Sequence, residues 1–130
     1  MRGTKSQTPL HLAVRSSRKD LAELLLASKA DVNARDKDDW TPLHFAADRG
    51  DKAIADTLLA KRADVNAQGN GGYTPLHFAA FLGHEDVAEL PLANGASVNA
   101  IDDKGETPLH VIANGHKGVV DLLRLHGGHE

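Results

Sequence analysis

The chain has no cysteine and very few aromatic residues, and both absences restrict what it can be. Without cysteine it has no disulfides, no thiolate metal ligands and no cysteine nucleophile. The same absence fits a reducing compartment, so we expect a cytoplasmic protein. Aromatic residues make up 4% of the 130 residues: one Trp, one Tyr and three Phe. So few rings predict that the core is organised by something other than large side chains.

The chain also lacks long apolar runs and a strong excess of one charge. No run approaches the about 18 residues that a membrane span needs. The first six residues have no apolar stretch, so we expect no signal peptide. The net charge of −3 disfavours nucleic-acid binding, since such domains are usually basic. A hydrophobic content of 41% and a charged content of 25% are typical of one globular domain.

Two short phrases recur along the chain at a constant interval of 33 residues. Thr-Pro-Leu-His begins at Thr8, Thr41, Thr74 and Thr107. Ala-Asp-Val-Asn-Ala at 30–34 recurs at 63–67 and, with Ser for Asp, at 96–100. A fixed period of this length is the mark of a repeat architecture. We therefore predict a single domain over 1–130, made of repeats at approximately 3–35, 36–68, 69–101 and 102–130.

Each unit has the pattern of two helices and a loop. Thr followed by Pro is typical of a helix N-cap with proline in the first helical position. In the first unit this predicts a helix over about 9–16, and apolar residues spaced by three and four predict a second over about 18–28. Gly50 and Gly83 follow the first helix of their units, and Ser17 takes that place in the first.

Pro91 departs from this pattern. It aligns with Leu25 and Leu58 in the interior of the second helix, where proline removes a hydrogen bond and costs about 3 kcal/mol. Two interpretations stay open: a kink that reshapes the third repeat, or a substitution that a stable array tolerates. In either case, replacing Pro91 by Leu is expected to stabilise the protein.

The 33-residue period and the two phrases resemble the ankyrin repeat, over roughly residues 3–127. The resemblance implies an all-α repeat solenoid of stacked helix-turn-helix units with projecting β-turn or hairpin loops. It also implies a non-catalytic protein-protein interaction module. The physics agrees, because one short unit cannot bury both sides of its helix pair whereas neighbouring units can.

The histidines do not suggest a chemical site. His11, His44, His77 and His110 lie one unit apart, so they cannot converge on one metal ion. In ankyrin repeats this histidine ties the turn to its neighbour, and we expect all four to be buried and neutral. Phosphate-binding and nucleophile-elbow motifs are absent from the sequence. We expect no enzyme activity, no cofactor and no metal.

The resemblance implies that partners dock on the loop tips and on the first helices, which line a concave face. Trp40 and Tyr73 precede the repeated Thr, and Phe81 and Leu82 end the first helix of the third unit. Trp and Tyr are enriched at binding hot spots. The alternative is that these two pack on each other and rigidify the loops. Phe45 and Phe78 are expected in the core. The predicted partner-binding residues are Lys37, Asp38, Trp40, Asp48, Arg49, Tyr73, Phe81, Leu82, Ile101 and Glu106.

Charge is distributed unevenly along the units. The net charge is +3 over 1–33, −1 over 34–66, −3 over 67–99 and −2 over 100–130. This is either an ordinary solvated surface or a field that steers a partner of opposite polarity. We expect a monomer that binds an unidentified protein. The alternatives are a regulatory ankyrin segment of a larger protein and a small-ligand sensor on the concave face.

Overall fold

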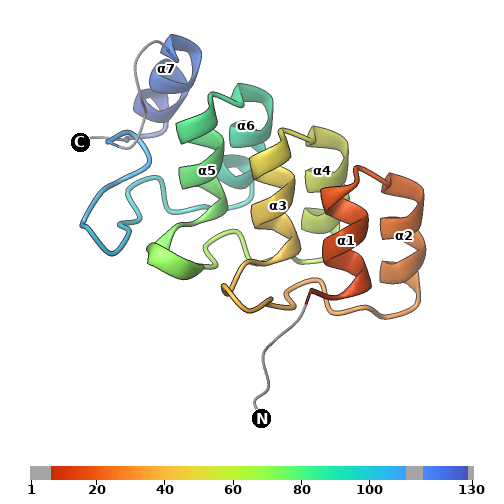
Figure 1. Cartoon of the computed structure of the whole chain (residues 1–130). Helices are drawn as coiled ribbons and strands as arrows, with labels where there is room; N and C mark the ends of the chain where they lie inside the picture. The colour runs from red at the N-terminus through yellow and green to blue at the C-terminus, as the bar shows by residue number, and fades with distance from the viewer. Residues whose placement is uncertain (1–6, 111–115, 129–130) are drawn as a thin grey trace.

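The computed structural model describes residues 7–110 and 116–128, and within them seven α-helices form two rows (Figure 1). One row holds α1 (Pro9–Arg15), α3 (Pro42–Arg49) and α5 (Pro75–Leu82). The other holds α2 (Lys19–Ala27), α4 (Lys52–Ala60) and α6 (Glu85–Ala93), and α7 (Lys117–Leu125) packs against α6. A short 3₁₀ turn, η1 (Asn70–Gly72), lies in the third loop. The two helices predicted for the first unit are confirmed.

Each helix of the first row begins in the same way. The hydroxyl oxygens of Thr8, Thr41 and Thr74 accept the backbone N–H of the histidine three residues later, at 3.2 to 3.4 Å. In return, Nδ1 of that histidine accepts the backbone N–H of the threonine at 3.0 to 3.1 Å. Proline follows the threonine, where its missing N–H costs nothing. The Thr-Pro-Leu-His phrase is therefore a reciprocal helix cap.

The first-row helices α3 and α5 end at a left-handed residue. Gly50 has φ 71° and Gly83 has φ 75°. A side chain at Gly50 would also meet the His84 ring of the next unit at 2.7 Å, so glycine is needed there for space as well as for its backbone angle. In the first unit, Ser17 adopts φ 56° without being a glycine, as its alignment with Gly50 predicts.

The core is aliphatic and lies between the two rows. The helices α3 and α5 each bury one leucine and two alanines, and α1 buries Leu10, Ala13 and Val14. The second row adds larger aliphatic side chains. The small side chains let neighbouring helices approach closely, which explains how the chain folds with so few rings. The most deeply buried aliphatic residues are Leu10, Val14, Leu43, Ile54, Leu58, Leu76, Val87, Val119 and Leu123.

The loops form hairpin-like tips that are joined by backbone hydrogen bonds. Each tip is closed by an N–H donated to the carbonyl four residues later, at 3.0 to 3.1 Å, from Asp36, Gly69 and Asp102. Consecutive tips are then linked at 2.9 Å, where Asn70 donates to the Asp38 carbonyl and Asp103 to the Gly71 carbonyl. No strand occurs in the described residues, so the loops are turns rather than a sheet.

The Ala-Asp-Val-Asn-Ala phrase links each unit to the next. The side-chain oxygens of Asn33 and Asn66 accept the backbone N–H of Asp64 and Ser97, both at 2.7 Å. The repeated asparagine therefore hydrogen-bonds one unit to the next in the loop that follows the second helix. Both repeated phrases thus supply contacts between units.

Pro91 is buried inside α6, which runs continuously from Glu85 to Ala93. Proline has no N–H, so the Val87 carbonyl receives no hydrogen bond from position 91. The helix nevertheless continues past it, and the Pro91 carbonyl accepts from Ala96 at 2.8 Å. Packing around Pro91 therefore holds the helix together across the missing bond.

The fourth unit is described only in part. The Thr107 hydroxyl accepts the backbone N–H of His110 at 3.2 Å, which starts the same cap as in the other units. Residues 111–115 lie outside the described residues, and with them the remainder of the predicted first helix of this unit. The second helix of the unit is α7. The boundaries of the four units stay a prediction.

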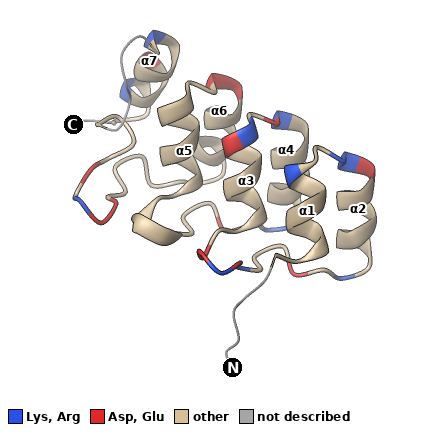
Figure 2. Ribbon diagram, in the orientation of Figure 1, with Lys and Arg blue, Asp and Glu red and all other residues tan. Residues whose placement is uncertain are grey.

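Charge is distributed unevenly over the helices. Charged residues lie on α1 to α4, on α6 and on α7, whereas α5 has none (Figure 2). Among the described residues, no helix is long and apolar enough to cross a membrane.

Candidate functional site

Three of the repeated histidines are fully buried and use both ring nitrogens. Nδ1 accepts from threonine, so the proton resides on Nε2. Nε2–H of His11, His44 and His77 donates to the carbonyl 29 residues later, at 2.8 to 2.9 Å. Each ring therefore bonds its own helix cap to the tip of the next unit. Neither nitrogen remains for catalysis or for a metal ion.

Burial keeps the rings of His44 and His77 neutral. It lowers the pKa of His44 from its ordinary value of 6.5 to about 4, although the hydrogen bond to the Tyr73 carbonyl acts in the opposite direction. Burial also lowers the pKa of His77, against the hydrogen bond to the Glu106 carbonyl. A neutral ring with one donor and one acceptor is the form that the two bonds require.

His110 does not follow the other three, and the expectation that all four are buried is wrong. Its side chain is 54% exposed, and Nε2 lies 3.4 Å from Oε2 of Glu106. In the other units the loop that begins the next unit covers the ring and supplies the carbonyl. His110 instead lies beside the Glu106 side chain of its own unit.

Two grooves lie between first helices and their neighbours, and we name them by position. The N-terminal groove, about 310 Å³, is lined by Leu12, Arg15, Ser16, Phe45, Asp48 and Arg49. The Arg15 guanidinium lies 5.4 Å from the centre of the Phe45 ring, and it donates to Oε1 of Gln7 at 2.6 Å. The chain's own cation therefore covers the aromatic ring in this groove.

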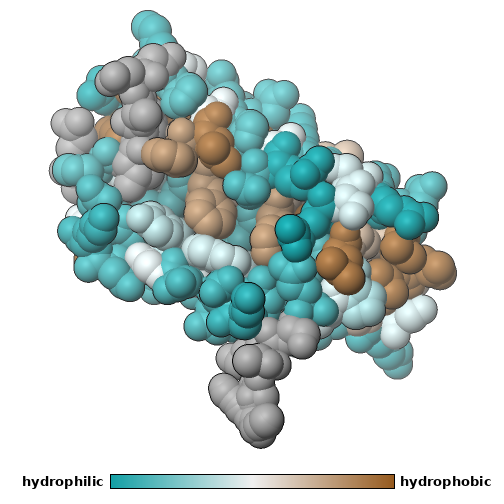
Figure 3. Space-filling model, in the orientation of Figure 1, coloured by the Kyte–Doolittle hydropathy of each residue, from teal (hydrophilic) through white to brown (hydrophobic). Residues whose placement is uncertain are grey.

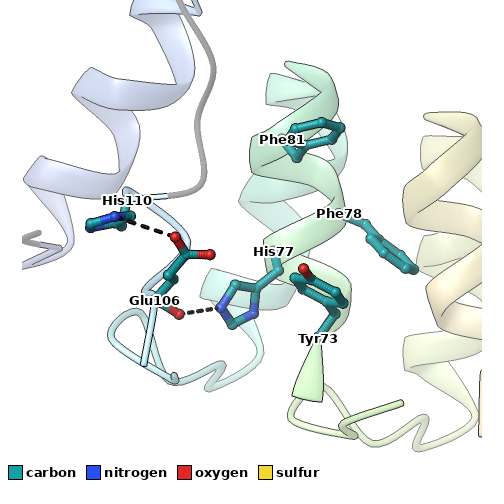
Figure 4. A pocket seen from close by; sticks show the side chains of 6 residues that line it. All are labelled: Tyr73, His77, Phe78, Phe81, Glu106 and His110. Carbon is teal, nitrogen blue, oxygen red and sulfur yellow. Dashed lines mark hydrogen bonds and ion pairs between the residues drawn. The ribbon is translucent and has the colours of Figure 1, made fainter. Parts of the chain in front are cut away.

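The C-terminal groove is larger, about 470 Å³, and lies between α5 and the fourth unit (Figure 4). Tyr73 and Phe81 lie on its α5 side, and Glu106 and His110 lie across from them. His77 and Phe78 complete the lining. Phe81 is 53% exposed, and none of the described residues that line the groove is a lysine or an arginine. The described lining therefore combines aromatic rings, two histidines and one carboxylate.

A row of rings crosses from the second loop to the C-terminal groove, with Phe78 in the middle. The centre of the Phe78 ring lies 4.9 Å from that of Trp40 and 6.0 Å from that of Tyr73. Trp40 and Tyr73 thus both pack on Phe78, and not simply on each other. Phe45 and Phe78 pack against the aliphatic core, as expected, but they are only half-buried and lie at its edge.

A family model supports the fold independently. The model for ankyrin repeats, which describes three copies of the repeat, matches residues 2–69 and 67–129. The chain belongs to the ankyrin repeat family. The predicted all-α solenoid is confirmed, since the described residues hold stacked helix pairs without a strand. A search of curated proteins found no match. Ankyrin repeats are generally protein-protein interaction modules.

In the ankyrin units, Trp40 has a scaffolding contact in addition to its place on a tip. Its ring lies directly over Gly69, where any side chain would collide with it. It also contacts the His44 ring at 5.0 Å, and its carbonyl is the acceptor for His11. Trp40 is therefore only partly exposed, and its role as a binding residue stays a prediction.

The other predicted binding residues fall into separate places. Tyr73, Phe81 and Glu106 come together in the C-terminal groove, and Asp48 and Arg49 in the N-terminal one. Leu82 is 37% exposed at the end of α5. Hydrophobic surface gathers over α5, and a separate area lies over α1 and α2 (Figure 3). Three residues lie on the loops, outside both grooves: Lys37, Asp38 and Ile101.

Four residues near the two grooves were missed by the sequence analysis. Leu12 and Phe78 follow the repeated histidine, and helical spacing from the buried Leu two positions earlier would have placed them on the outer face. The exposure of His110 could not be predicted from its phrase, because Thr-Pro-Leu-His is identical in all four units. Asp102 was missed because its burial depends on how the loops stack.

Asp102 is buried, with 4% of its surface exposed, in the loop beside the C-terminal groove. Its Oδ1 accepts the backbone N–H groups of Lys104 and Glu106 at 2.8 and 2.9 Å. Burial acts to raise its pKa, but these hydrogen bonds outweigh burial, and the pKa is lowered. Asp102 is therefore an ionised carboxylate. Among the described residues, no group of three or more potential ligands is arranged to hold a metal ion.

Proposed function

We propose that this chain is a non-catalytic adaptor that binds a partner protein through the face formed by α1, α3 and α5 and through the adjoining loop tips. The observation that carries the proposal is the exposure of Phe81, beside Leu82, on a helix without charged residues. The repeated histidines are used for packing, so the positions that differ between units are the ones available for recognition.

The energetics favour an interface at this place. Removing a large exposed aromatic side chain from water on binding lowers the free energy, whereas removing a charged side chain raises it unless that charge is paired. Aromatic residues also supply much of the binding free energy at protein interfaces. The mixed charges on neighbouring units then contribute to orientation and association rate. The lack of cysteine supports a cytoplasmic location, and we infer that the chain acts as a monomer.

The test is a quantitative pull-down from cells that express the chain, with mass spectrometry of the bound proteins. The bait is compared with the double variant Phe81→Ala, Leu82→Ala. The control is Leu24→Ala, because Leu24 is 62% exposed but lies on α2 in the other row. We expect at least one protein to be retained by the native chain and the control, and to be lost from the double variant.

A urea melt of each bait shows that loss of capture is not loss of fold. Truncating exposed side chains changes the free energy of unfolding by less than about 1 kcal/mol. If the double variant captures every protein as well as the native chain does, the α1–α3–α5 face is not the binding surface.

A further inference from the structure

The two grooves differ in where their positive charge comes from. In the N-terminal groove, Arg15 of the chain itself lies over the Phe45 ring. In the C-terminal groove, Tyr73 and Phe81 present their rings, and the part of the lining that the structure describes holds no lysine or arginine. The sequence has no lysine or arginine at all between Arg62 and Lys104. The C-terminal groove therefore has the aromatic part of such a contact but lacks the cation.

Carboxylates are present where a cation would enter. Glu106 lines the groove directly and is half-buried. The ionised carboxylate of Asp102 lies beside it in the same loop, and its Oδ1 accepts the backbone N–H of Glu106 at 2.9 Å. Oδ2 of Asp102 has no hydrogen-bond partner. In the second unit the equivalent Oδ2, of Asp36, is bonded by Gln7 at 3.3 Å.

This unsatisfied oxygen matters because a buried charge is costly unless it is paired. Nε2 of His110 lies 3.4 Å from Oε2 of Glu106 on the same side of the groove, and the His110 side chain is mostly exposed. His77 is engaged by Thr74 and the Glu106 carbonyl and stays neutral. The potential in the groove is thus negative, and its walls are aromatic.

We propose that the C-terminal groove accepts an arginine or lysine side chain from a basic segment of the partner protein. The cationic head lies against the rings of Tyr73 and Phe81 and pairs with the Glu106 carboxylate. The aliphatic stem of the side chain covers the exposed surface of Phe81. This inference rests on the proposed function and adds the chemistry of the partner to it.

The experiment starts from a phage library that displays random 12-residue peptides. The library is panned on the full chain and depleted on the Phe81→Ala, Leu82→Ala variant. We expect the recovered peptides to be enriched in arginine or lysine next to an apolar residue. A synthetic peptide of the consensus sequence is then titrated against the native chain, Glu106→Gln, and Glu89→Gln, the matched control, since Glu89 is an exposed glutamate on α6 in the other row.

The expected result is that Glu106→Gln weakens binding of the peptide about fivefold or more, while Glu89→Gln changes its affinity less than about twofold. Replacing the consensus arginine by citrulline, or the lysine by norleucine, should weaken binding about tenfold, because the shape is kept and the charge removed. The loss on Glu106→Gln should shrink as the salt concentration rises.

The alternative outcomes separate this inference from the proposed function. Peptides that depend on Phe81 and Leu82 but show no basic enrichment, or that bind Glu106→Gln as well as the native chain, overturn the cation proposal and leave the binding face in place. If panning yields no peptide that depends on Phe81 and Leu82, both proposals fail.

Discussion

The two ends of the α1–α3–α5 face have the same backbone conformation but carry side chains of different chemical type. Arg15, Asp48 and Phe81 occupy the same position in successive units. At the N-terminal end that position holds a cation that packs on a ring, and at the C-terminal end it holds a ring that is 53% exposed. The helices are capped and packed alike in both places. The repeat therefore fixes where a side chain points and leaves its chemistry free.

The same contrast holds for the repeated histidine. His44 is buried and joins two units, whereas His110 is exposed beside Glu106. Identical phrases thus have different consequences because of the loop that follows each one. The four predictions below test this difference between the middle of the stack and its two ends, in order of decreasing effect.

The largest effect is expected from His44→Ala. It removes a buried ring and leaves the Thr41 backbone N–H and the Tyr73 carbonyl without their partner. We expect the free energy of unfolding to fall on the order of 4 kcal/mol. The matched variant His110→Ala should lower it by less than about 0.5 kcal/mol. Urea unfolding measures both, and equal losses would mean that the two histidines have equivalent roles.

The second-largest effect is expected from acid, which should destabilise the middle of the stack. The pKa of His44 is about 4 when folded and near 6.5 when unfolded, so between these values the unfolded state binds more protons. Stability is therefore lost as the pH falls from 6.5 towards 4, by about 3 kcal/mol for His44. His77 acts in the same direction. The lowered pKa of Asp102 affects stability only below its ordinary 3.8.

Urea melts at several pH values across that window measure this loss. NMR titration of the His44 ring provides the control, since its midpoint should lie near pH 4. Stability that does not change between pH 6.5 and 4 would contradict the neutral, hydrogen-bonded state of the buried rings.

A smaller effect is expected at Pro91, in the second helix of the third unit. Leu25 and Leu58 are the equivalents in α2 and α4. Pro91→Leu restores an N–H for the Val87 carbonyl, and we expect a gain of roughly 1–2 kcal/mol. The gain is less than the full penalty because Pro91 is already buried and packed. Thermal or urea melts test it, and an unchanged midpoint would mean that α6 is unstrained.

The smallest effect is expected from Arg15→Ala at the N-terminal groove. It removes the contact with Phe45 and the hydrogen bond to Gln7, both at the surface. We expect a loss of no more than about 0.5–1 kcal/mol. Arg15→Lys should keep part of it. A loss of several kcal/mol would show that this groove belongs to the core and is not a variable surface.

The sequence predicted the fold well because its two phrases encode contacts within and between neighbouring units. Thr-Pro-Leu-His specifies a helix cap and an aliphatic core position, so the helix bounds followed from it to within a residue or two. It predicted the candidate site less well. Phe78 and Trp40 meet across two units, and the burial of Asp102 depends on how the loops stack. Such contacts form only when the units stack in the folded protein, and no fixed spacing in the sequence predicts them.

The most direct test of the central claim is to map a bound peptide on the protein by NMR. The isotope-labelled full chain is titrated with the consensus peptide recovered by panning, and changes in backbone amide shifts are recorded. We predict that the largest changes cluster on residues 73–82 and at Glu106, around the C-terminal groove. Changes centred on Arg15 and Phe45, or on the second-row helices α2, α4 and α6, would contradict the account.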